Sequence, residues 1–301
     1  MPRPIDHLVL AVPNLTAAVA LYGALGFTVG GRNRHPWGTE NAVVQLAEAY
    51  LELIGLAEHF RPAPSEDDAA PFADAVAAAV ARGGGLAMMA MRSTDADCDA
   101  ARFEAAGMGQ GRRLDFSRHA DAPDGTRREL SFGLAFTANP SLPEAGLFTC
   151  RHHYPENFWN PTARIHANGG LRLDDIVLAV AEPRAHLPFF AAICDAAPAG
   201  TATRPSFETG TGRIDLMTPQ EVRARYGPTA AATPGRFAGF GVVVESLGAV
   251  RACCDRAGIP HGEIAGAVVV PPERAFGVAL AFTTAPRHSQ SRTTGRPPAW
   301  T

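Results

Sequence analysis

The residues best suited to chemistry are an imidazole and a carboxylate, each the polar member of a short apolar run. His7 is the third residue of IDHLVLAV at positions 5–12, and Glu52 lies in YLEL at positions 50–53. If both runs are strands whose polar side chains face one cavity, nitrogen and oxygen ligands of this kind suit Zn, Fe(II), Mn, Ni or Co. We therefore predict a divalent metal site at His7 and Glu52. Taken singly, His7 also fits a core histidine and Glu52 a solvent-facing acid.

The first of these runs recurs in the second half of the chain. IDHLVLAV at 5–12 matches LDDIVLAV at 173–180, and a later short strand carries an acid in both copies. The second copy has Asp175 in place of His7 and Asp215 in place of Glu52. This pattern predicts a duplicated chain in which only the first half keeps the imidazole. Two acids without an imidazole make a poor transition-metal site, so we expect the second copy to serve packing.

The segments around these runs repeat one order, which is strand, helix and three strands. Alternating apolar runs predict the strands, and a 3.6-residue period with Asn14 as a cap predicts the first helix. In the first half we expect strands at 5–12, 27–32, 41–46, 49–56, 86–91, 110–116, 127–136 and 147–152, and helices after Asn14, at 72–82 and at 95–106. Two further units follow from 171 and from 237. The chain is therefore predicted to be an α+β protein of four tandem βαβββ modules.

Length, charge and composition exclude several classes of function. The 301 residues, 46% hydrophobic, are enough for two domains that each bury a core. A net charge of -3 without a basic block argues against a nucleic-acid partner. No run approaches the ~20 apolar residues that span a bilayer, and no signal-like start is present, so we expect no membrane partner and a cytoplasmic protein. The 5 cysteines have no CxxC spacing and fit reduced thiols.

The paired modules also carry a family resemblance. A first module that opens on DHLVLAV and closes on YLEL resembles the vicinal oxygen chelate (VOC) superfamily, and the loop HPWGTEN at 35–41 and the bridge RHHYPENFWNP…HANGG at 151–170 resemble its glyoxalase-like members. The resemblance implies two glyoxalase/bleomycin-resistance/dioxygenase-like domains, each with a sheet curled into a half-open cup. It also implies a divalent metal that is chelated by two neighbouring oxygens of a small-molecule substrate.

On this basis the chain divides into four parts. The first VOC domain, with the metal site, spans residues 1–153, a bridge spans 154–170, and a second, degenerate VOC domain spans 171–285. The tail 286–301 is rich in Ser, Thr, Arg and Pro and is predicted to be mobile. A homodimer is compatible with this organisation.

The resemblance implies a third metal ligand from the second module. Its first strand offers only Ala87 at the position of His7, so the last strand must supply the ligand. His152 would complete a set of two histidines and one carboxylate, which leaves coordination positions open. Strand parity leaves Cys150 and His153 as alternatives.

The resemblance further places substrate contacts at the mouth of the cup. His35, Thr39 and Asn41 lie in or beside the HPWGTEN loop, and Trp159 of the bridge could close the pocket. The alternatives are turn chemistry for the loop and simple docking of the bridge onto a surface.

These residues lead to three hypotheses on function. The first is a metal-dependent enzyme of lyase or isomerase type, in which Glu52 also acts catalytically on a proton, and extradiol-type dioxygenation is its close alternative. The second is a metal-free protein that sequesters a flat small molecule by aromatic contacts. The third is a scaffold protein that would tolerate changes at His7 and Glu52.

Overall fold

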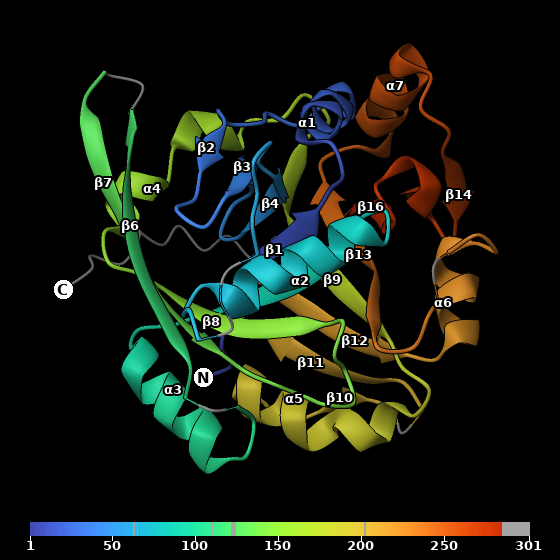
Figure 1. The fold of residues 1–301 in the computed structure, drawn as a ribbon. Helices are drawn as coiled ribbons and strands as arrows, with labels where there is room; N and C mark the ends of the chain where they lie inside the picture. Colours follow the sequence, from blue (N-terminus) through green and yellow to red (C-terminus); the bar gives the residue numbers. More distant parts are fainter. Residues whose placement is uncertain are drawn as a thin grey trace.

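The computed structural model describes residues 1–62, 64, 66–109, 111–121, 125–201, 203–230 and 232–284. The predicted tail at 286–301 lies outside the described residues. Within them the chain forms two eight-stranded mixed sheets with helices packed against them (Figure 1). No helix in the described ranges has the length and hydropathy that a bilayer crossing requires.

Each half of the chain supplies one sheet and its helices. The first half contains β1 (Ile5–Ala11), α1 (Leu15–Ala24), β2 (Asn33–Arg34), β3 (Thr39–Gln45), β4 (Tyr50–Leu56), α2 (Ala70–Ala81), β5 (Gly85–Arg92), α3 (Ala96–Ala105), β6 (Arg113–Asp121), β7 (Arg127–Phe136), β8 (Gly146–His152), α4 (Pro155–Phe158) and the 3-10 helix η1 (Pro161–Arg164). The second half contains β9 (Gly170–Ala179), η2 (Pro183–His186), α5 (Leu187–Cys194), β10 (Ala199–Gly200), β11 (Pro205–Thr209), β12 (Gly212–Met217), α6 (Pro219–Tyr226), β13 (Arg236–Val244), α7 (Leu247–Ala257), β14 (Gly262–Ile264), β15 (Ala267–Val270), η3 (Pro272–Arg274) and β16 (Ala279–Thr284).

The two sheets have the same topology. The first has the strand order β2-β3-β4-β1-β5-β8-β7-β6, and the second has the order β10-β11-β12-β9-β13-β16-β15-β14. In both, the opening strand of the half runs parallel to the last strand of its own module and antiparallel to the opening strand of the next. This arrangement confirms four βαβββ modules, paired into two VOC-like domains.

Most predicted elements match the structure to within a few residues, but the first edge strand was predicted wrongly. The run 27–32 is not a strand, and the edge strand is only Asn33–Arg34. Gly30 and Gly31 interrupt the run, and glycine weakens a strand interior because it has no side chain to pack. The helix start was predicted correctly, since the Asn14 side chain accepts a hydrogen bond from the Ala17 amide at 3.0 Å.

The first sheet curls until its two edges meet. Arg118 of β6 donates a hydrogen bond of 2.7 Å to the Asn33 side chain of β2, although these strands are the opposite edges of the sheet. The long β6–β7 hairpin extends from the body of the molecule along this side (Figure 1). The inner face of the curled sheet therefore encloses a space between β1, β3, β4, β6, β7 and β8.

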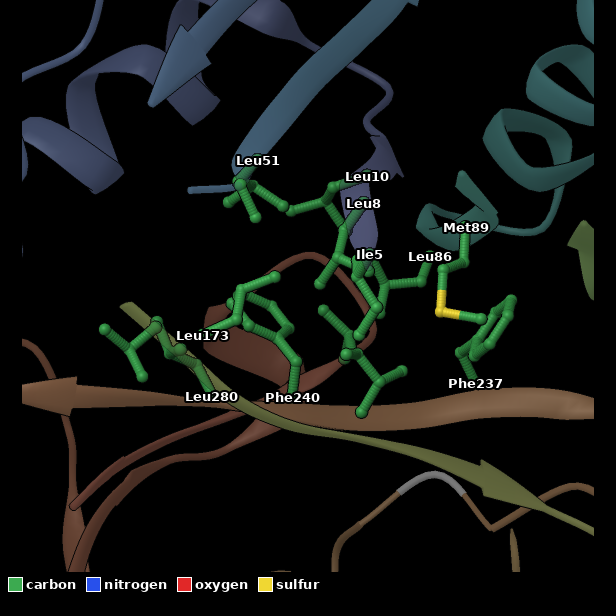
Figure 2. Packing of buried hydrophobic residues seen from close by; sticks show 14 of the residues in the cluster. Ile5, Leu8, Leu10, Leu51, Leu86, Met89, Leu173, Phe237, Phe240 and Leu280 are labelled. Carbon is green, nitrogen blue, oxygen red and sulfur yellow. The ribbon is translucent and has the colours of Figure 1, made fainter. Parts of the chain in front are cut away.

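The outer faces of the two sheets pack against each other. Leu8 and Leu10 of β1 join one buried cluster with Leu173 of β9 and Phe240 of β13 (Figure 2). Because side chains alternate across a strand, burying Leu8 and Leu10 between the sheets turns His7 and Val9 to the inner face. The same apolar core that joins the two halves thus orients His7.

Candidate functional site

A bulge at the start of β1 brings two successive polar side chains together. The register with β5 shifts between Ile5 and His7, and a bulge interrupts the strict alternation of side chains. As a result the Asp6 carboxylate contacts the His7 ring, with Asp6 Oδ2 at 2.7 Å from His7 Nδ1. The same oxygen lies 3.1 Å from Nε2 of His152. Asp6 is 1% exposed and His7 3% exposed.

The electrostatics of Asp6 follow from these contacts. Burial alone would raise the pKa of the Asp6 carboxyl, but the charge and hydrogen bonds of His152 and His7 outweigh it. The net pKa therefore lies below its ordinary value. A carboxylate on Nδ1 also fixes the orientation of the His7 ring, which leaves Nε2 as the nitrogen that faces the interior.

Glu52 lies opposite this nitrogen on the neighbouring strand. β4 runs parallel to β1, with His7 paired to Tyr50 and Val9 to Glu52. His7 Nε2 and Glu52 Oε2 are 4.0 Å apart. The Tyr50 ring stacks on the His7 ring with centroids 4.4 Å apart. Two bonds of about 2.0 to 2.2 Å span up to about 4.4 Å, so both atoms can reach one shared ion, at a donor–metal–donor angle wider than the tetrahedral one.

The HPWGTEN loop places a second imidazole beside Glu52. His35 Nε2 lies 3.8 Å from Glu52 Oε1, and Asn41 Nδ2 donates to that same oxygen and lies 3.5 Å from His35 Nε2. Thr39 stands behind the ring, with its hydroxyl 2.8 Å from His35 Nδ1. Burial lowers the pKa of His35 to about 4, against the opposing charge of Glu52. His35 is therefore neutral at pH 7.

These side chains surround a narrow buried cavity of about 30 Å³. His7, Glu52, His35 and Asn41 supply its polar wall, whereas Thr39 is not part of the lining. The remaining lining is mostly aromatic and apolar and comprises Trp37, Val43, Tyr50, Phe72, Phe116, Arg118, Phe132, Leu134, Cys150 and Phe158. A cavity of this volume has room for a metal ion or one or two water molecules. Its volume is far below the roughly 300 Å³ at which small-molecule sites begin.

The last strand of the domain, β8, presents two of the three residues proposed as the third ligand. Cys150 is buried among the inner-face residues, and its Sγ lies within 4.8 Å of ligand atoms of both Asp6 and His7. Burial raises the pKa of the Cys150 thiol, and Asp6 and Glu52 raise it further. His152 shares this face, but its Nε2 is directed at Asp6. His153 is the next residue and points to the other face of the sheet. Its Nε2 lies 3.5 Å from the position that a Cβ on Gly133 would occupy.

Trp159 lies outside the narrow cavity. Its ring stacks parallel to His152 with centroids 6.5 Å apart and makes an edge contact with Tyr50. The Arg164 guanidinium covers the Trp159 ring at 4.7 Å. Trp159 therefore contacts the shell of side chains around the cavity and borders a larger groove beyond it.

Sequence reasoning passed over two residues of this site. Asp6 was not considered, because successive side chains of a regular strand point to opposite faces and only the bulge brings Asp6 to His7. Arg118 lines the cavity from β6, whose predicted segment at 110–116 ended before it. No local sequence signal marks a residue that reaches a site through curling of the sheet.

The second half holds no comparable pair. Asp175 and Asp215 occupy the equivalent strand positions, but Arg225 of α6 pairs with Asp175, and Arg213 bonds Asp215 through two contacts of 2.9 Å. Burial raises the pKa of Asp175 to about 6. Within the described residues, the one group of three clustered metal-ligand side chains is Asp6, His7 and Cys150 of the first half.

Comparisons with known proteins agree with this architecture. The glyoxalase-like domain family matches residues 5–194. No curated protein matches the sequence. A hypothetical protein from Staphylococcus aureus has a similar fold, with a TM-score of 0.64 at 8% identity, and the match covers 94% of this chain and 100% of that one.

Two other solved structures share the fold at low sequence identity. A xylose isomerase-like TIM barrel/4-hydroxyphenylpyruvate dioxygenase fusion protein matches with a TM-score of 0.53 at 16% identity over 94% of this chain and 49% of that one. A mutant of 4-hydroxymandelate synthase from Streptomyces coelicolor matches with a TM-score of 0.50 at 16% identity over 88% of this chain and 78% of that one. Together with the family match, the fold and its paired modules show that this chain belongs to the glyoxalase-like domain family of the VOC superfamily.

Proposed function

We propose that this protein is a metal-dependent enzyme that moves a proton on a small organic substrate, in a reaction of lyase or isomerase type. The observation that carries the proposal is the 4.0 Å separation of His7 Nε2 and Glu52 Oε2 in a buried pocket. Both side chains are almost fully buried, and a buried carboxylate needs a partner for its charge.

The donor set fits a divalent cation. His7 offers Nε2 while Asp6 holds its Nδ1, an arrangement typical of histidines that bind metals. Glu52 offers Oε2, and Cys150 is the residue of β8 that clusters with His7. Nitrogen, oxygen and sulfur donors of this kind suit Zn, Fe(II) or Co better than Mg or Ca. When bound, the cation would act as a Lewis acid on two neighbouring substrate oxygens.

The protein's own groups would then position and move the proton. Asn41 donates to Glu52 Oε1 and thereby fixes the carboxylate plane. We propose Glu52 as the group that accepts a proton from a carbon next to a carbonyl. The His35 ring beside Glu52 would stay neutral, because burial keeps its pKa near 4, and would therefore place no positive charge next to the carboxylate. The surrounding rings, Trp37 and Phe116 among them, would exclude water.

Two measurements test the proposal. Protein purified without a tag is expected to carry metal near one equivalent, and His7→Ala and Glu52→Ala are expected to lose it. With the metal present, incubation of small 2-hydroxy ketones and dicarbonyls in D₂O should place deuterium at the carbon next to the carbonyl, and Glu52→Gln should abolish this exchange. Asp215→Asn, the matched change in the second sheet, should alter neither result. Metal-free protein that exchanges no carbon-bound proton would overturn the proposal.

The aromatic walls favour one other candidate, a metal-free protein that binds a flat molecule without turnover. Trp37 stacks on His35 with centroids 4.7 Å apart, and Phe116 meets Trp37 edge to face. Such rings give affinity for planar ligands. This candidate predicts tight binding of an aromatic compound that is unchanged in His7→Ala, whereas the enzyme proposal predicts that the metal is lost in that variant.

A further inference from the structure

A large groove lies next to the narrow cavity, between the bridge and the edges of the first sheet. It has a volume of about 750 Å³, which is enough for a small organic molecule. Its wall includes the arginines Arg32, Arg34, Arg118 and Arg128. Among the described residues of this wall, none is Asp or Glu. The described part of the wall therefore carries arginines and no carboxylate.

Three of these arginines form no ion pair with a carboxylate of the described residues. Among the described residues, Arg118 has one hydrogen bond, to Asn33 at 2.7 Å, and its Nε is buried without a partner. Arg32 donates to the Thr16 hydroxyl. Arg34 is exposed, and within the described part of the chain neither it nor Arg32 or Arg118 lies within 4.0 Å of a carboxylate. Elsewhere in the molecule, Arg213, Arg225 and Arg236 are all paired with acids.

The groove and the narrow cavity meet at shared residues. Arg118, Val43 and Phe158 line both spaces. Arg118 lies close enough to Glu52 for their charges to interact. A molecule that held a negative group on Arg118 and Arg34 would therefore extend its other end toward Glu52 and His7.

The bridge supplies the opposite wall and is held firmly against the sheet. Gln45 of β3 donates to the Phe158 carbonyl at 2.8 Å and accepts from the Asn160 amide at 2.9 Å. His166 lies 2.9 Å from the Gln45 carbonyl through Nε2. These bonds keep Trp159 and Phe158 at the groove, where their rings offer an apolar surface beside the arginines.

From this juxtaposition we infer that the substrate of the proposed reaction is an organic anion, a carboxylate or a phosphate monoester, whose negative group binds Arg34 and Arg118 in the groove. Guanidinium groups form paired, charge-assisted hydrogen bonds with such anions. The inference rests on the proposed function, since it assigns the groove to the same substrate that reacts at Glu52. The carbon part of the molecule would lie along Phe158 and reach the narrow cavity.

Binding of simple aromatic probes tests the inference with the full chain as purified. Calorimetry and tryptophan fluorescence would compare benzoate, phenyl phosphate and the neutral benzamide. At least one anion is expected to bind about tenfold or more tighter than benzamide, and rising salt should weaken it. Benzoate alone would indicate a carboxylate substrate, and phenyl phosphate alone a phosphate monoester.

Matched variants locate the binding. Arg34→Gln and Arg118→Gln should each weaken the anion by about tenfold, as expected for loss of one charged hydrogen-bonding partner. Arg118→Gln breaks the contact with Asn33 and could therefore unfold the protein. Arg34 is exposed, so Arg34→Gln should fold and still tests the inference in that case. Arg223→Gln removes the same charge from the exposed face of α6 and should bind as the wild type does.

The outcomes separate this inference from the proposed function. Equal affinity for all three probes, or anion binding that is unchanged in Arg34→Gln, would overturn the inference even when the protein holds metal and exchanges protons. Absence of metal and of proton exchange would overturn the proposed function, while anion binding at Arg34 would still establish the groove as an anion site.

Discussion

The two sheets share one topology, but the charged and aromatic side chains in their interiors differ. At three equivalent positions the first sheet has His7, Tyr50 and Glu52, and the second has Asp175, Arg213 and Asp215. In the first sheet Tyr50 stacks on the imidazole and leaves its Nε2 facing Glu52. In the second sheet Arg213 neutralises both acids, at 2.9 Å from Asp215 and 3.7 Å from Asp175.

Helix α6 also makes the interior of the second sheet different from that of the first. Its last residues, Arg225 and Tyr226, enter the interior of the second sheet, where a Cβ on Gly239 would collide with the Tyr226 ring. The interior of the first sheet keeps a cavity that continues into the arginine groove. The same backbone topology thus holds a polar cavity with His7 and Glu52 in one copy and neutralised acids packed against Tyr226 in the other.

The largest expected effect is the loss of the ion pair inside the second sheet. Arg225→Ala leaves the fully buried Asp175 without its main partner, and removing one member of a buried pair costs about 3–5 kcal/mol. Urea unfolding at pH 8 would measure the change in the free energy of unfolding. Arg223→Ala, an exposed neighbour on the same helix, should stay within about 0.5 kcal/mol of wild type. A small effect of Arg225→Ala would mean that the second core does not depend on this pair.

The same carboxyl predicts a pH dependence of stability. Burial raises the pKa of Asp175 from 3.8 to about 6, so between these values the folded state binds more protons than the unfolded state. Its contribution to stability is therefore present below about pH 4 and is lost as the pH rises through about 6, by up to about 3 kcal/mol. Unfolding free energies measured from pH 4 to 7 should show this loss in wild type. Asp175→Asn should reduce the slope over that range, and an unchanged slope would contradict the prediction.

Placing the residue of the second sheet at the position of His7 tests this difference between the sheets directly. His7→Asp places the second sheet's residue in the first, and it should weaken metal binding by about a hundredfold, since even an outer partner of a metal ligand is worth about 10- to 100-fold. Metal content after dialysis against a graded chelator would measure it. Asp175→Asn should leave metal binding unchanged. Metal binding that survives His7→Asp would remove His7 from the ligand set.

The smallest expected effect concerns the carboxylate behind the imidazole. Asp6→Asn keeps the shape of the side chain but removes the charge on His7 Nδ1, and we expect metal affinity to fall by about tenfold. Asp174→Asn is the matched change, because Asp174 precedes Asp175 as Asp6 precedes His7 and accepts from Thr283 at 2.8 Å. If both variants bind metal equally well, Asp6 has only a structural role.

Much of the architecture could be predicted because it depends on local patterns. Matched apolar runs predicted the duplication, and alternation predicted that β1 and β4 would carry His7 and Glu52 as polar residues on apolar strands. Asn14 was predicted as a helix cap from its type and position. The short edge strand β2 was missed because two glycines and a tight turn leave no periodic signal there.

The four modules, the family resemblance and the asymmetry between His7 and Asp175 could be predicted from residue types and their spacing along the chain, because each is a local pattern. Which side chains meet depends on the folded chain: the bulge joins Asp6 to His7, the parity of β8 turns Cys150 and His152 inward, and the curled sheet brings Arg118 from its far edge to Asn33. The hydrogen bond of Arg118 joins it to Asn33, 85 positions away, and arises from sheet closure, which no local pattern records.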